Sequence, residues 1–405
     1  MSAASPALSG VARSGLCAGC GACAAAAPGK VAMTVNEAGF ARPSQREAFS
    51  AAEENVVANV CPSLSLRQDA GDRVDDVLWG PYLDVYSGHA VDERLRHHAS
   101  SGGALSAFVT HLLESGAAKF VLQTAASETQ PIGNEARISA DSEDVYAAAG
   151  SRYAPSSPLA DLDAALARRQ PFVFVGKPCD AAALRALAQF DARINEFIVC
   201  VVTFFCAGVP SLKGAEEIVR TMGADPDDVL SFRYRGDGWP GKARATLKTG
   251  EAREMSYHDS WGKILTRRLQ PRCKICPDGT GGHADISFAD AWHCDEKGYP
   301  LFEERPGRSL IVTRTPVGET LFKAARAAGA IRSEPTPVET IAAMQIGQVK
   351  RRKLAWSRLA ALRLWRGDAP VFTGYRLRDG ARLAGVFANL KSFLGTSRRV
   401  LLNKF

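Results

Sequence analysis

The sequence contains no long hydrophobic run and none of the common nucleotide-binding fingerprints. No stretch of about 18 uninterrupted apolar residues occurs, so we expect no membrane-spanning helix. Residues 1–15 have neither a basic start nor an apolar run of signal-peptide length, which predicts a cytoplasmic protein. No G-x-G-x-x-G lies between a strand and a helix, and G-x-x-x-x-G-K-[ST] is missing. The sequence therefore predicts neither a standard Rossmann site nor a P-loop.

Cysteine is also sparse, with 10 residues in a chain of 405. This is too few for a disulfide-dense scaffold, yet several of the cysteines are closely spaced. Grouped thiols in a cytosolic protein typically bind a metal or carry out redox chemistry. With 46% hydrophobic residues, the chain is apolar enough to fold and long enough for two or three units.

Positive charge is concentrated in residues 340–405, which carry 14 lysines and arginines against 2 acidic residues and thus a net charge of +12. The rest of the chain carries −5, since the net charge of the whole is +7. Leucines recur at helical spacing around Trp356 and Trp365, and residues 383–394 form a second amphipathic segment. We therefore predict basic amphipathic helices in this tail.

Two roles fit such a tail. It can be a solvated pair of helices, or it can lie on an acidic partner subunit or an anionic inner membrane surface. In the second case Trp356 and Trp365, flanked by the basic residues 350–353, form the contact surface. No recognition motif accompanies the charge, so no specific nucleic-acid binding is predicted.

The middle of the chain alternates between short apolar runs and helical patterns, which predicts a mixed α/β body. Strands are predicted at 120–122, 172–175, 197–205, 284–288 and 310–312, and helices at 104–114, 158–169, 181–189 and 212–222. Such a sheet delivers loop residues to its carboxyl edge, where ligands usually bind. Residues 230–247 contain two strand-like runs around a Gly/Pro-rich turn, which predicts an inserted antiparallel hairpin.

Three cysteines near the N-terminus, Cys17, Cys20 and Cys23, form C-x2-C-x2-C. Three thiolates on one short loop can reach three corners of a cubane 4Fe-4S cluster. In the ferredoxin run the fourth cysteine falls at the position of Ala27, so Cys61, in a distant Cys-Pro, is the candidate fourth ligand, or the cluster has three ligands. Zinc is the alternative, although three cysteines so close together crowd a single zinc ion.

Four further cysteines are candidates for a second cluster: Cys179, Cys206, Cys273 and Cys276. The first two follow apolar strands directly, and the last two form C-x2-C. Strands that end at one edge of a sheet can bring these thiols together. The alternative is that each strand-end cysteine is a buried small hydrophobe.

The remaining candidates are single residues. Cys200 lies inside an apolar run, so core packing is predicted, whereas Cys294 beside His293 is either structural or faces a redox centre. His98 and His293 are candidates to supply a proton, against the alternative of an exposed or core histidine.

Residues 97–104, HHASSGGA, precede an apolar-periodic helix that a serine can cap, and their small size lets backbone N–H groups approach an anion or a flat ring. They belong to an ordered set of motifs: CAGCGAC with a distal Cys-Pro, HASSGGALSAF, AGSRYAPSS, FVGKPCDAAAL, FFCAG, GDGWPG and RCKICPDGTGGHADISFADAW. In this order, over about residues 10–330, the chain resembles the coenzyme F(420) hydrogenase/dehydrogenase beta-subunit family. That family includes deazaflavin-oxidising hydrogenase subunits and ferredoxin-linked chlorophyll-type reductases.

The resemblance implies FAD and one or two 4Fe-4S clusters. It assigns the first cluster to Cys17, Cys20, Cys23 and Cys61, and the second, nearer the flavin, to Cys179, Cys206, Cys273 and Cys276. The flavin-lining set that it implies is Ser100, Ser101, Gly102, Gly103, Ser151, Arg152, Tyr153, Lys177, Asp285 and Asp290. Lys177 and Arg152 are candidates to steady the anionic flavin or its phosphates, and Lys177, His98 and His293 form the candidate catalytic set.

These expectations divide the chain into an N-terminal 4Fe-4S module at 1–67, loop-like and with little periodicity, a mixed-sheet body at 68–339 and the basic helical tail at 340–405. The predicted function is an iron–sulfur flavoprotein oxidoreductase. A ferredoxin or another one-electron donor reduces the clusters, and hydride passes between FAD and a conjugated substrate or deazaflavin coenzyme. Two alternatives stay open: an electron-transfer subunit without a substrate of its own, and a zinc-stabilised binding module.

Overall fold

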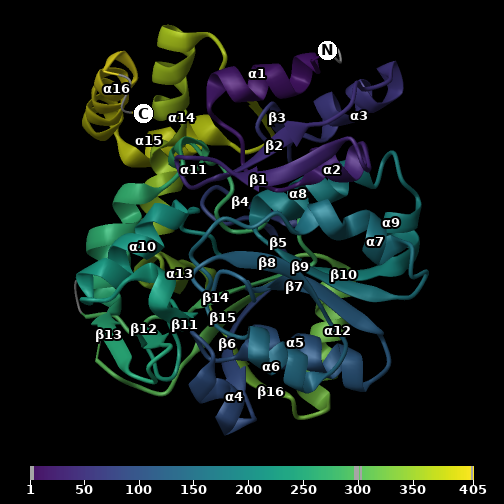
Figure 1. Ribbon diagram of the computed structural model, residues 1–405, viewed down its shortest axis with the longest axis vertical. Helices are drawn as coiled ribbons and strands as arrows, with labels where there is room; N and C mark the ends of the chain where they lie inside the picture. Colours follow the sequence, from purple (N-terminus) through teal and green to yellow (C-terminus); the bar gives the residue numbers. More distant parts are fainter. Residues whose placement is uncertain (1–3, 296–300, 302, 403–404) are drawn as a thin grey trace.

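The computed structural model describes residues 4–295, 301, 303–402 and 405. Its centre is an eight-stranded sheet in the order β16-β6-β15-β14-β10-β9-β7-β8 (Figure 1). The inner strands run parallel: β7 (Phe120–Ala126), β9 (Phe172–Gly176), β10 (Ile198–Phe204) and β14 (Ile286–Asp290). The outer strands pair antiparallel: β8 (Asn134–Ser139), β15 (Ser309–Thr313), β6 (Asp84–Ala90) and β16 (Ile331–Pro335). The prediction of a mixed α/β body is confirmed.

Strand β9 shows why the sheet is covered on both faces. All five of its residues are buried, and successive side chains point to opposite faces. Val173 and Val175 belong to a core cluster with α5 (Ala104–Glu114) and α12 (Pro316–Ala327). Phe172 and Phe174 belong to a second cluster with α7 (Leu162–Leu166) and α8 (Pro178–Leu187). Each such side chain stabilises the fold by about 1.5–3 kcal/mol through burial.

Every strand and helix predicted for the body has a counterpart, but two boundaries differ in an informative way. Helix α8 begins at Pro178 rather than at 181, so Cys179 lies in the first helical turn and not in a loop. The predicted helix 158–169 is a 3-10 turn, Pro158–Asp161, followed by the short α7. The other helices of the body are α4 (Glu93–His98), α6 (Ser142–Ala148), α9 (Arg193–Phe197), α10 (Leu212–Thr221) and α11 (Pro271–Lys274).

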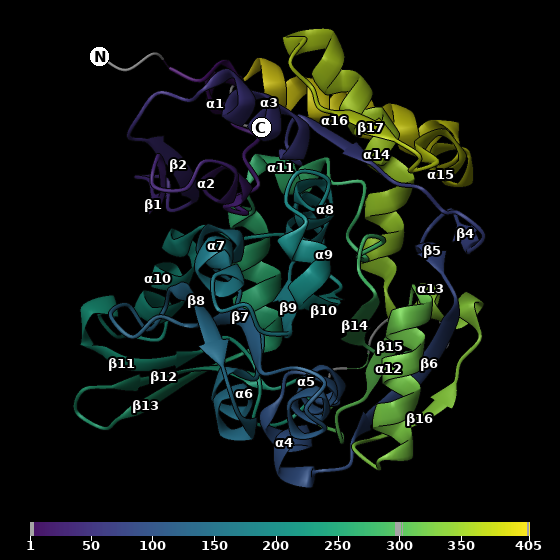
Figure 2. The same ribbon diagram turned by 90° about the vertical axis from the view of Figure 1, so that its right-hand side faces the viewer.

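The predicted hairpin is present and carries a third strand. β11 (Val229–Arg233), β12 (Lys242–Leu247) and β13 (Ala252–Ser256) form an antiparallel sheet that projects to one side of the body (Figure 2). Phe232 and Tyr234 pack with Ile218 of α10 in a separate core cluster. The loop between β11 and β12 turns back towards the main sheet and carries Arg235 and Trp239.

The expectation of a loop-like segment at 1–67 is wrong. It contains α1 (Pro6–Ser14), α2 (Ala22–Ala26), the hairpin β1 (Val31–Val35) and β2 (Ala41–Gln45), α3 (Ala51–Val60) and β3 (Ser65–Arg67). The elements are short, so periodicity is hard to detect, but local signals are strong: Ser50 and Glu53 form a capping box at the start of α3. A small hairpin, β4 (Val74–Asp76) and β5 (Gly80–Tyr82), follows. The division into three domains stays a prediction.

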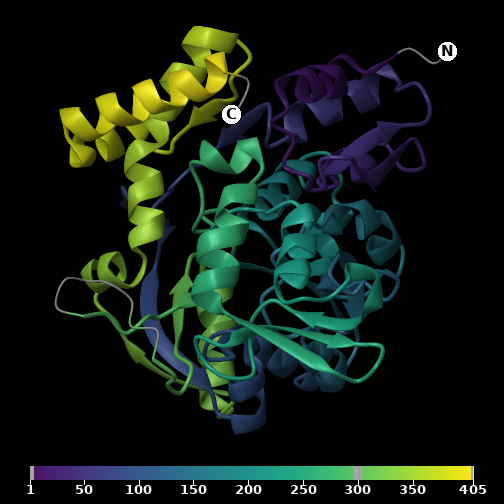
Figure 3. The same cartoon turned by 60° about the vertical axis from the view of Figure 1, so that its left-hand side comes forward.

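The tail is helical, as predicted: α13 (Ile341–Met344), α14 (Ile346–Arg366), α15 (Leu377–Ala384) and α16 (Val386–Leu401), with β17 (Val371–Thr373) paired to β3. The single amphipathic segment expected at 383–394 is interrupted, because Gly385 takes a φ of +77° between α15 and α16. The tail helices lie beside the N-terminal segment at one end of the molecule (Figure 3). Among the described residues, no helix is long and apolar enough to span a bilayer.

Half of the basic run 350–353 points inward, which the sequence did not predict. Arg352 is buried and donates from Nε to the Val77 carbonyl at 2.8 Å. Arg351 donates from Nη1 to the Cys206 carbonyl at 2.9 Å and from Nη2 to the Ala207 carbonyl. These two charges therefore anchor α14 to the body and are not part of an exposed contact surface.

Candidate functional site

A cavity of about 290 Å³ opens at the carboxyl edge of the parallel strands. Its wall combines the residues before α5, the loop at 148–154, Lys177 after β9, the end of β10 with residues 205–210, and the end of β14. The volume is close to the lower limit for small-molecule sites, and the location is the one that parallel strands favour. This placement agrees with the sequence-based expectation for the sheet edge.

The glycine-serine segment before α5 contributes one side of the wall. Ser100, Ser101 and Gly103 line the cavity, whereas Gly102 lies behind it, where an added Cβ would stand 2.7 Å from the Ser309 nitrogen. No serine caps α5, because its N-cap is Gly103, with a φ of +72° and no side-chain hydrogen bond. The amides of the first turn of α5 are therefore left without a side-chain cap beside the cavity.

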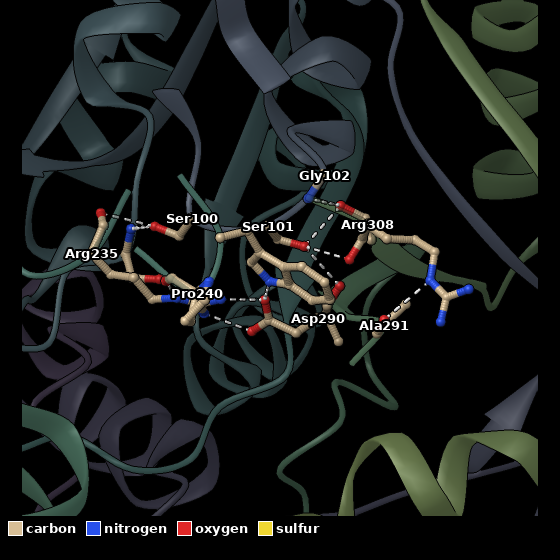
Figure 4. A network of polar contacts seen from close by, with 12 residues as sticks. Ser100, Ser101, Gly102, Arg235, Pro240, Asp290, Ala291 and Arg308 are labelled. Atoms are coloured by element: carbon tan, nitrogen blue, oxygen red, sulfur yellow. Dashed lines mark hydrogen bonds and ion pairs between the residues drawn. The ribbon is translucent and has the colours of Figure 1, made fainter. Parts of the chain in front are cut away.

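Ser100 joins this segment to two other parts of the wall. Its Oγ donates to the Arg235 carbonyl at 3.2 Å and accepts a hydrogen bond from the Ser151 amide (Figure 4). Ser101 Oγ lies 3.0 Å from Ser309 Oγ. These contacts hold the backbone of three separate segments in fixed positions around the cavity.

Asp290, at the end of β14, forms a bidentate ion pair with a buried arginine. Arg235 Nη1 and Nη2 donate to its two oxygens at 2.8 and 2.7 Å, and Trp239 Nε1 donates to Oδ1 at 2.9 Å (Figure 4). Burial alone would lower the pKa of Arg235, but the Asp290 carboxylate outweighs it and raises that pKa. The guanidinium also lies 4.8 Å from the ring centroids of Tyr257 and Trp292. The cavity thus has a fixed cation beside aromatic rings.

Lys177 is a second fixed cation in the wall. Its Nζ donates to the Ser156 carbonyl at 3.0 Å and hydroxyl at 2.8 Å, and lies 2.8 Å from Asp180 Oδ2. Burial lowers the pKa of Lys177, but the charges of Asp180 and Cys179 outweigh it and raise that pKa to about 12. The amine is therefore protonated at neutral pH, and its place in the candidate catalytic set stays a prediction.

The other predicted flavin-lining residues divide into two groups. Ser151, Arg152 and Tyr153 line the cavity, but the Arg152 guanidinium donates to backbone carbonyls such as that of Phe232, at 2.6 Å. Asp285 is not in the wall: it accepts from the Val201 amide and the Thr315 hydroxyl, each at 2.7 Å, and pairs with Arg185 at 2.8 Å. Asp285 therefore connects β10, α8 and the start of α12.

Neither candidate histidine lines the cavity. His98 Nδ1 lies 2.9 Å from Asp237 Oδ1, Nε2 lies 2.9 Å from Arg233 Nη1, and its ring stacks on Tyr146. Burial and Arg233 lower the pKa of His98, and burial and Arg308 lower that of His293. The proton-donor role of both histidines stays a prediction.

Sequence reasoning missed several residues of the wall: Arg235, Tyr257, Trp261, Trp292, Gln345 and Gln348. Arg235 directly precedes the motif GDGWPG and Trp292 is the last residue of FADAW, so both motifs offered an available signal. Gln345 and Gln348 come from the basic tail, and no local pattern marks them. They donate to the carbonyls of Asp290 at 2.7 Å and Cys206 at 3.0 Å.

The first cysteine set gathers in the N-terminal segment. Cys20, Cys23 and Cys61 each lie close enough to another cysteine of the set for its charge to raise their pKa, and Cys17 is that neighbour for Cys23 and Cys61. Burial, together with these charges, raises the pKa of Cys23 to about 12 and that of Cys61 to about 11. Such thiols are protonated unless a cation binds, since a bound metal favours the thiolate.

The second set, Cys179, Cys206, Cys273 and Cys276, lines one small cavity. Arg272 also lines it, is 2% exposed, and keeps its Nε and Nη1 without a hydrogen-bond partner. Two unpaired donors on a buried cation are costly unless an anionic group faces them. A cluster bound by four thiolates carries net negative charge, so the donor set and Arg272 both fit such a group.

Among the described residues, no group of three or more His, Cys, Asp or Glu side chains is arranged to hold a single metal ion. In a cubane cluster each thiolate binds a different iron, so the four sulfurs stand further apart than the ligands of one ion. Cys200 is buried in the sheet core, as predicted, and Cys294 Sγ lies 3.1 Å from the Ala343 carbonyl, outside both cavities.

The fold and site thus define an α/β protein whose sheet edge carries a ligand cavity beside grouped thiols. Residues 85–162 match the N-terminal family described as coenzyme F(420) hydrogenase/dehydrogenase, beta subunit, and residues 170–339 match the C-terminal part of the same subunit. Together the two matches cover more than half of the chain. The chain belongs to the coenzyme F(420) hydrogenase/dehydrogenase beta-subunit family, and the resemblance found in the sequence is confirmed.

Individual relatives agree with this placement. The chain is 24% identical over 335 residues to an F(420)H(2) dehydrogenase subunit of Methanosarcina mazei, covering 82% of this chain and 88% of that one. It is 25% identical over 248 residues to an F(420)-dependent formate dehydrogenase beta subunit of Methanococcus maripaludis, covering 58% of this chain and 62% of that one. A chain of the F(420)-reducing [NiFe] hydrogenase complex from Methanosarcina barkeri shares the fold, with a TM-score of 0.57 at 20% identity, covering 75% of this chain and 99% of that chain. The family supports the prediction of an electron-transfer oxidoreductase.

Proposed function

We propose that the chain is an FAD- and 4Fe-4S-dependent oxidoreductase, with the flavin ring in the sheet-edge cavity and one cluster on each cysteine set. The observation that carries this proposal is the shared wall between the two cavities. Cys206, Gly208 and Val209 line both the 290 Å³ cavity and the small cavity of the second cysteine set. A redox centre on that set would lie directly beside a ligand in the larger cavity.

The first cysteine set continues this line. Cys20 lies close enough to Cys179 for its charge to add to the raised pKa of Cys179, which comes mainly from burial. Gln270, next to the second set, donates from Nε2 to the Ala18 carbonyl at 3.1 Å and accepts from Arg42 at 3.3 Å. The second cysteine set therefore lies between the first set and the larger cavity. This is the order that stepwise one-electron transfer from the first set to a flavin in the cavity requires.

Clusters carry single electrons, and a bound flavin exchanges them for the two-electron hydride of a substrate. The chain's own residues supply the surroundings. Lys177 and Arg235 line the wall as cations that are each paired with a carboxylate, and the first turn of α5 adds the positive end of a helix, which favours negative charge in the cavity. Tyr257, Trp261 and Trp292 provide flat apolar surface for a ring.

The relatives indicate the partner classes. The relatives are named as subunits of F(420)-dependent dehydrogenases. We therefore infer that a reduced or oxidised deazaflavin exchanges hydride with this chain and that a partner subunit exchanges electrons with it. Ferredoxin or another one-electron donor is the alternative electron source, and an anionic membrane surface is the alternative contact for the tail. The second candidate function is that of an electron-transfer subunit with no substrate of its own, which the named subunits favour.

The test is anaerobic purification with iron, sulfide, zinc and flavin analysis. Two clusters require about eight irons per chain, together with one flavin. Zinc without flavin would reject this proposal in favour of a zinc-stabilised binding module. A screen with reduced ferredoxin, reduced deazaflavin and reduced pyridine nucleotide then separates the two functions: flavin that turns over no small acceptor with any donor indicates a subunit that needs its partner.

A further inference from the structure

Helix α16 presents an exposed apolar stripe to solvent. Phe387, Leu390, Leu394 and Leu401 recur three, four and seven residues apart, so they lie on one face of the helix. Phe387 is 89% exposed, whereas the adjoining face, with Thr396, Ser397 and Val400, is buried. Helix α16 lies on the outside of the tail (Figure 3), and contiguous exposed apolar surface of this kind marks a contact site.

Charge of one sign accompanies the stripe. Helix α16 contains no acidic residue, and Lys391, Arg398 and Arg399 are all exposed. Lys391 directly follows Leu390, and Arg398 comes four residues after Leu394. The two cations are seven residues apart, so both lie along the same edge of the stripe. Leu383, exposed at the end of α15, extends the apolar stripe across the break at Gly385.

We propose that this face, Leu383 to Leu401 across α15 and α16, binds the surface of an anionic lipid bilayer in its plane. An interfacial helix needs an apolar stripe that enters the headgroup boundary and cations that meet the lipid phosphates, and this face has both and no carboxylate on α16. The one acidic residue of α15, Asp379, is neutralised by Arg376 and Arg382 at 3.1 and 2.7 Å. The face lies outside the residues that match the family, so it is a property of this chain's tail.

This placement differs from the surface expected around Trp356 and Trp365. Arg351 and Arg352, which were to flank those tryptophans, bind carbonyls of the body. Their charge is therefore not available to lipid, whereas Lys391, Arg398 and Arg399 point outward. The proposal is independent of the cofactors, because α16 lines neither cavity.

The experiment is sedimentation of the full chain with vesicles of phosphatidylcholine alone or mixed with phosphatidylglycerol. The wild-type chain binds the mixed vesicles and not the neutral ones, and binding weakens with salt. Phe387→Glu/Leu394→Glu abolishes binding. Lys391→Gln/Arg398→Gln weakens it about 25-fold, since each cation near an anionic surface contributes about fivefold. Matched controls on the three-stranded sheet, Leu230→Glu at a side chain 61% exposed and Lys242→Gln/Arg244→Gln, bind as the wild-type chain does.

Circular dichroism and thermal unfolding, measured on each variant, report whether the fold is intact. Binding to neutral vesicles as strong as to anionic ones, or no binding to either, overturns the proposal. Light scattering after gel filtration measures the molar mass of the protein in solution and so tests whether a second copy of the chain binds this face instead. Self-association that Phe387→Glu/Leu394→Glu removes, without vesicle binding, would assign the face to a second copy of the chain.

Discussion

Arg272 Nη2 donates to the Pro62 carbonyl at 2.9 Å, which connects the residue before Cys273 with the residue after Cys61. The same guanidinium keeps two buried N–H groups without a partner and lines the cavity of the second cysteine set. One buried cation thus contacts the chain of the first set and faces the second. Its position makes it a sensitive probe of whether the second set holds an anionic centre.

Replacing Arg272 with methionine should lower the reduction potential of a cluster on the second set, because the lost positive charge no longer stabilises its more negative, reduced state. We expect a shift of about 60 mV or more, equivalent to a tenfold change in a one-electron equilibrium. A potentiometric titration followed by electron paramagnetic resonance measures it. Arg272→Lys, which keeps the charge, should retain most of the potential. If both variants kept their full iron content and an unchanged reduction potential, the proposed effect of Arg272 would be contradicted, whereas cluster binding by the second set would not.

Single cysteine variants should separate the two sets. Cys17→Ser should remove about half of the iron and leave the flavin, because its set lies away from the larger cavity. Cys206→Ser should remove the other half and also weaken flavin binding, since Cys206 lines both cavities. Cys200→Ala, in the sheet core, is the control and should keep both cofactors. Equal iron in all three variants would argue against cluster binding by these thiols.

Asp290→Asn should destabilise the fold by about 3 kcal/mol, because it leaves the buried Arg235 without its carboxylate. The measurement is the free energy of unfolding in denaturant under conditions where refolding is complete. Glu254→Gln breaks an ion pair with Lys242 whose two side chains are well exposed, and should leave the free energy of unfolding nearly unchanged. The same Asp290 variant should bind flavin more weakly, since the pair with Arg235 forms part of the wall.

The ion pair between Glu53 and Lys30 should make the stability of the fold depend on pH in the acidic range. Hydrogen bonds from Lys30 and Ser50 hold the pKa of Glu53 at about 2, below its ordinary value of 4.5. The stabilisation is therefore complete above pH 4.5 and is lost as the pH falls towards 2. As the pH is lowered from 4.5 to 2, the midpoint temperature of thermal unfolding should fall more steeply for the wild-type chain than for Glu53→Gln. Glu47→Gln, at an exposed position of the same segment, should leave the slope unchanged.

Local patterns in the sequence determined the elements of the body and the grouping of its thiols. Runs such as FVFV at 172–175 and the periodic segment 104–114 specify strand and helix through side-chain spacing alone. C-x2-C spacings place thiols within reach of one another for the same local reason. The order of the motifs along the chain is also enough to identify the family.

Only the tertiary structure decided which of these residues share a site. Asp285 and Asp290 belong to the same motif, ADISFAD, yet only Asp290 reaches the cavity wall. Asp285 precedes β14, and its oxygens bind the Val201 amide and Arg185. Asp290 ends the strand at the carboxyl edge of the sheet, where the cavity opens. The position of each aspartate along β14 therefore separates a structural role from a place in the site.

The tail follows the same rule. Its basic, amphipathic character is readable from the sequence, but the inward turn of Arg351 and Arg352, the break at Gly385 and the entry of Gln345 and Gln348 into the cavity wall are not. Each of these depends on which segments, far apart along the chain, pack side by side. Periodicity and spacing record only neighbours within a few residues, so the sequence determined the elements and the chemistry, whereas packing decided which residues form the site and which face of the tail stays exposed.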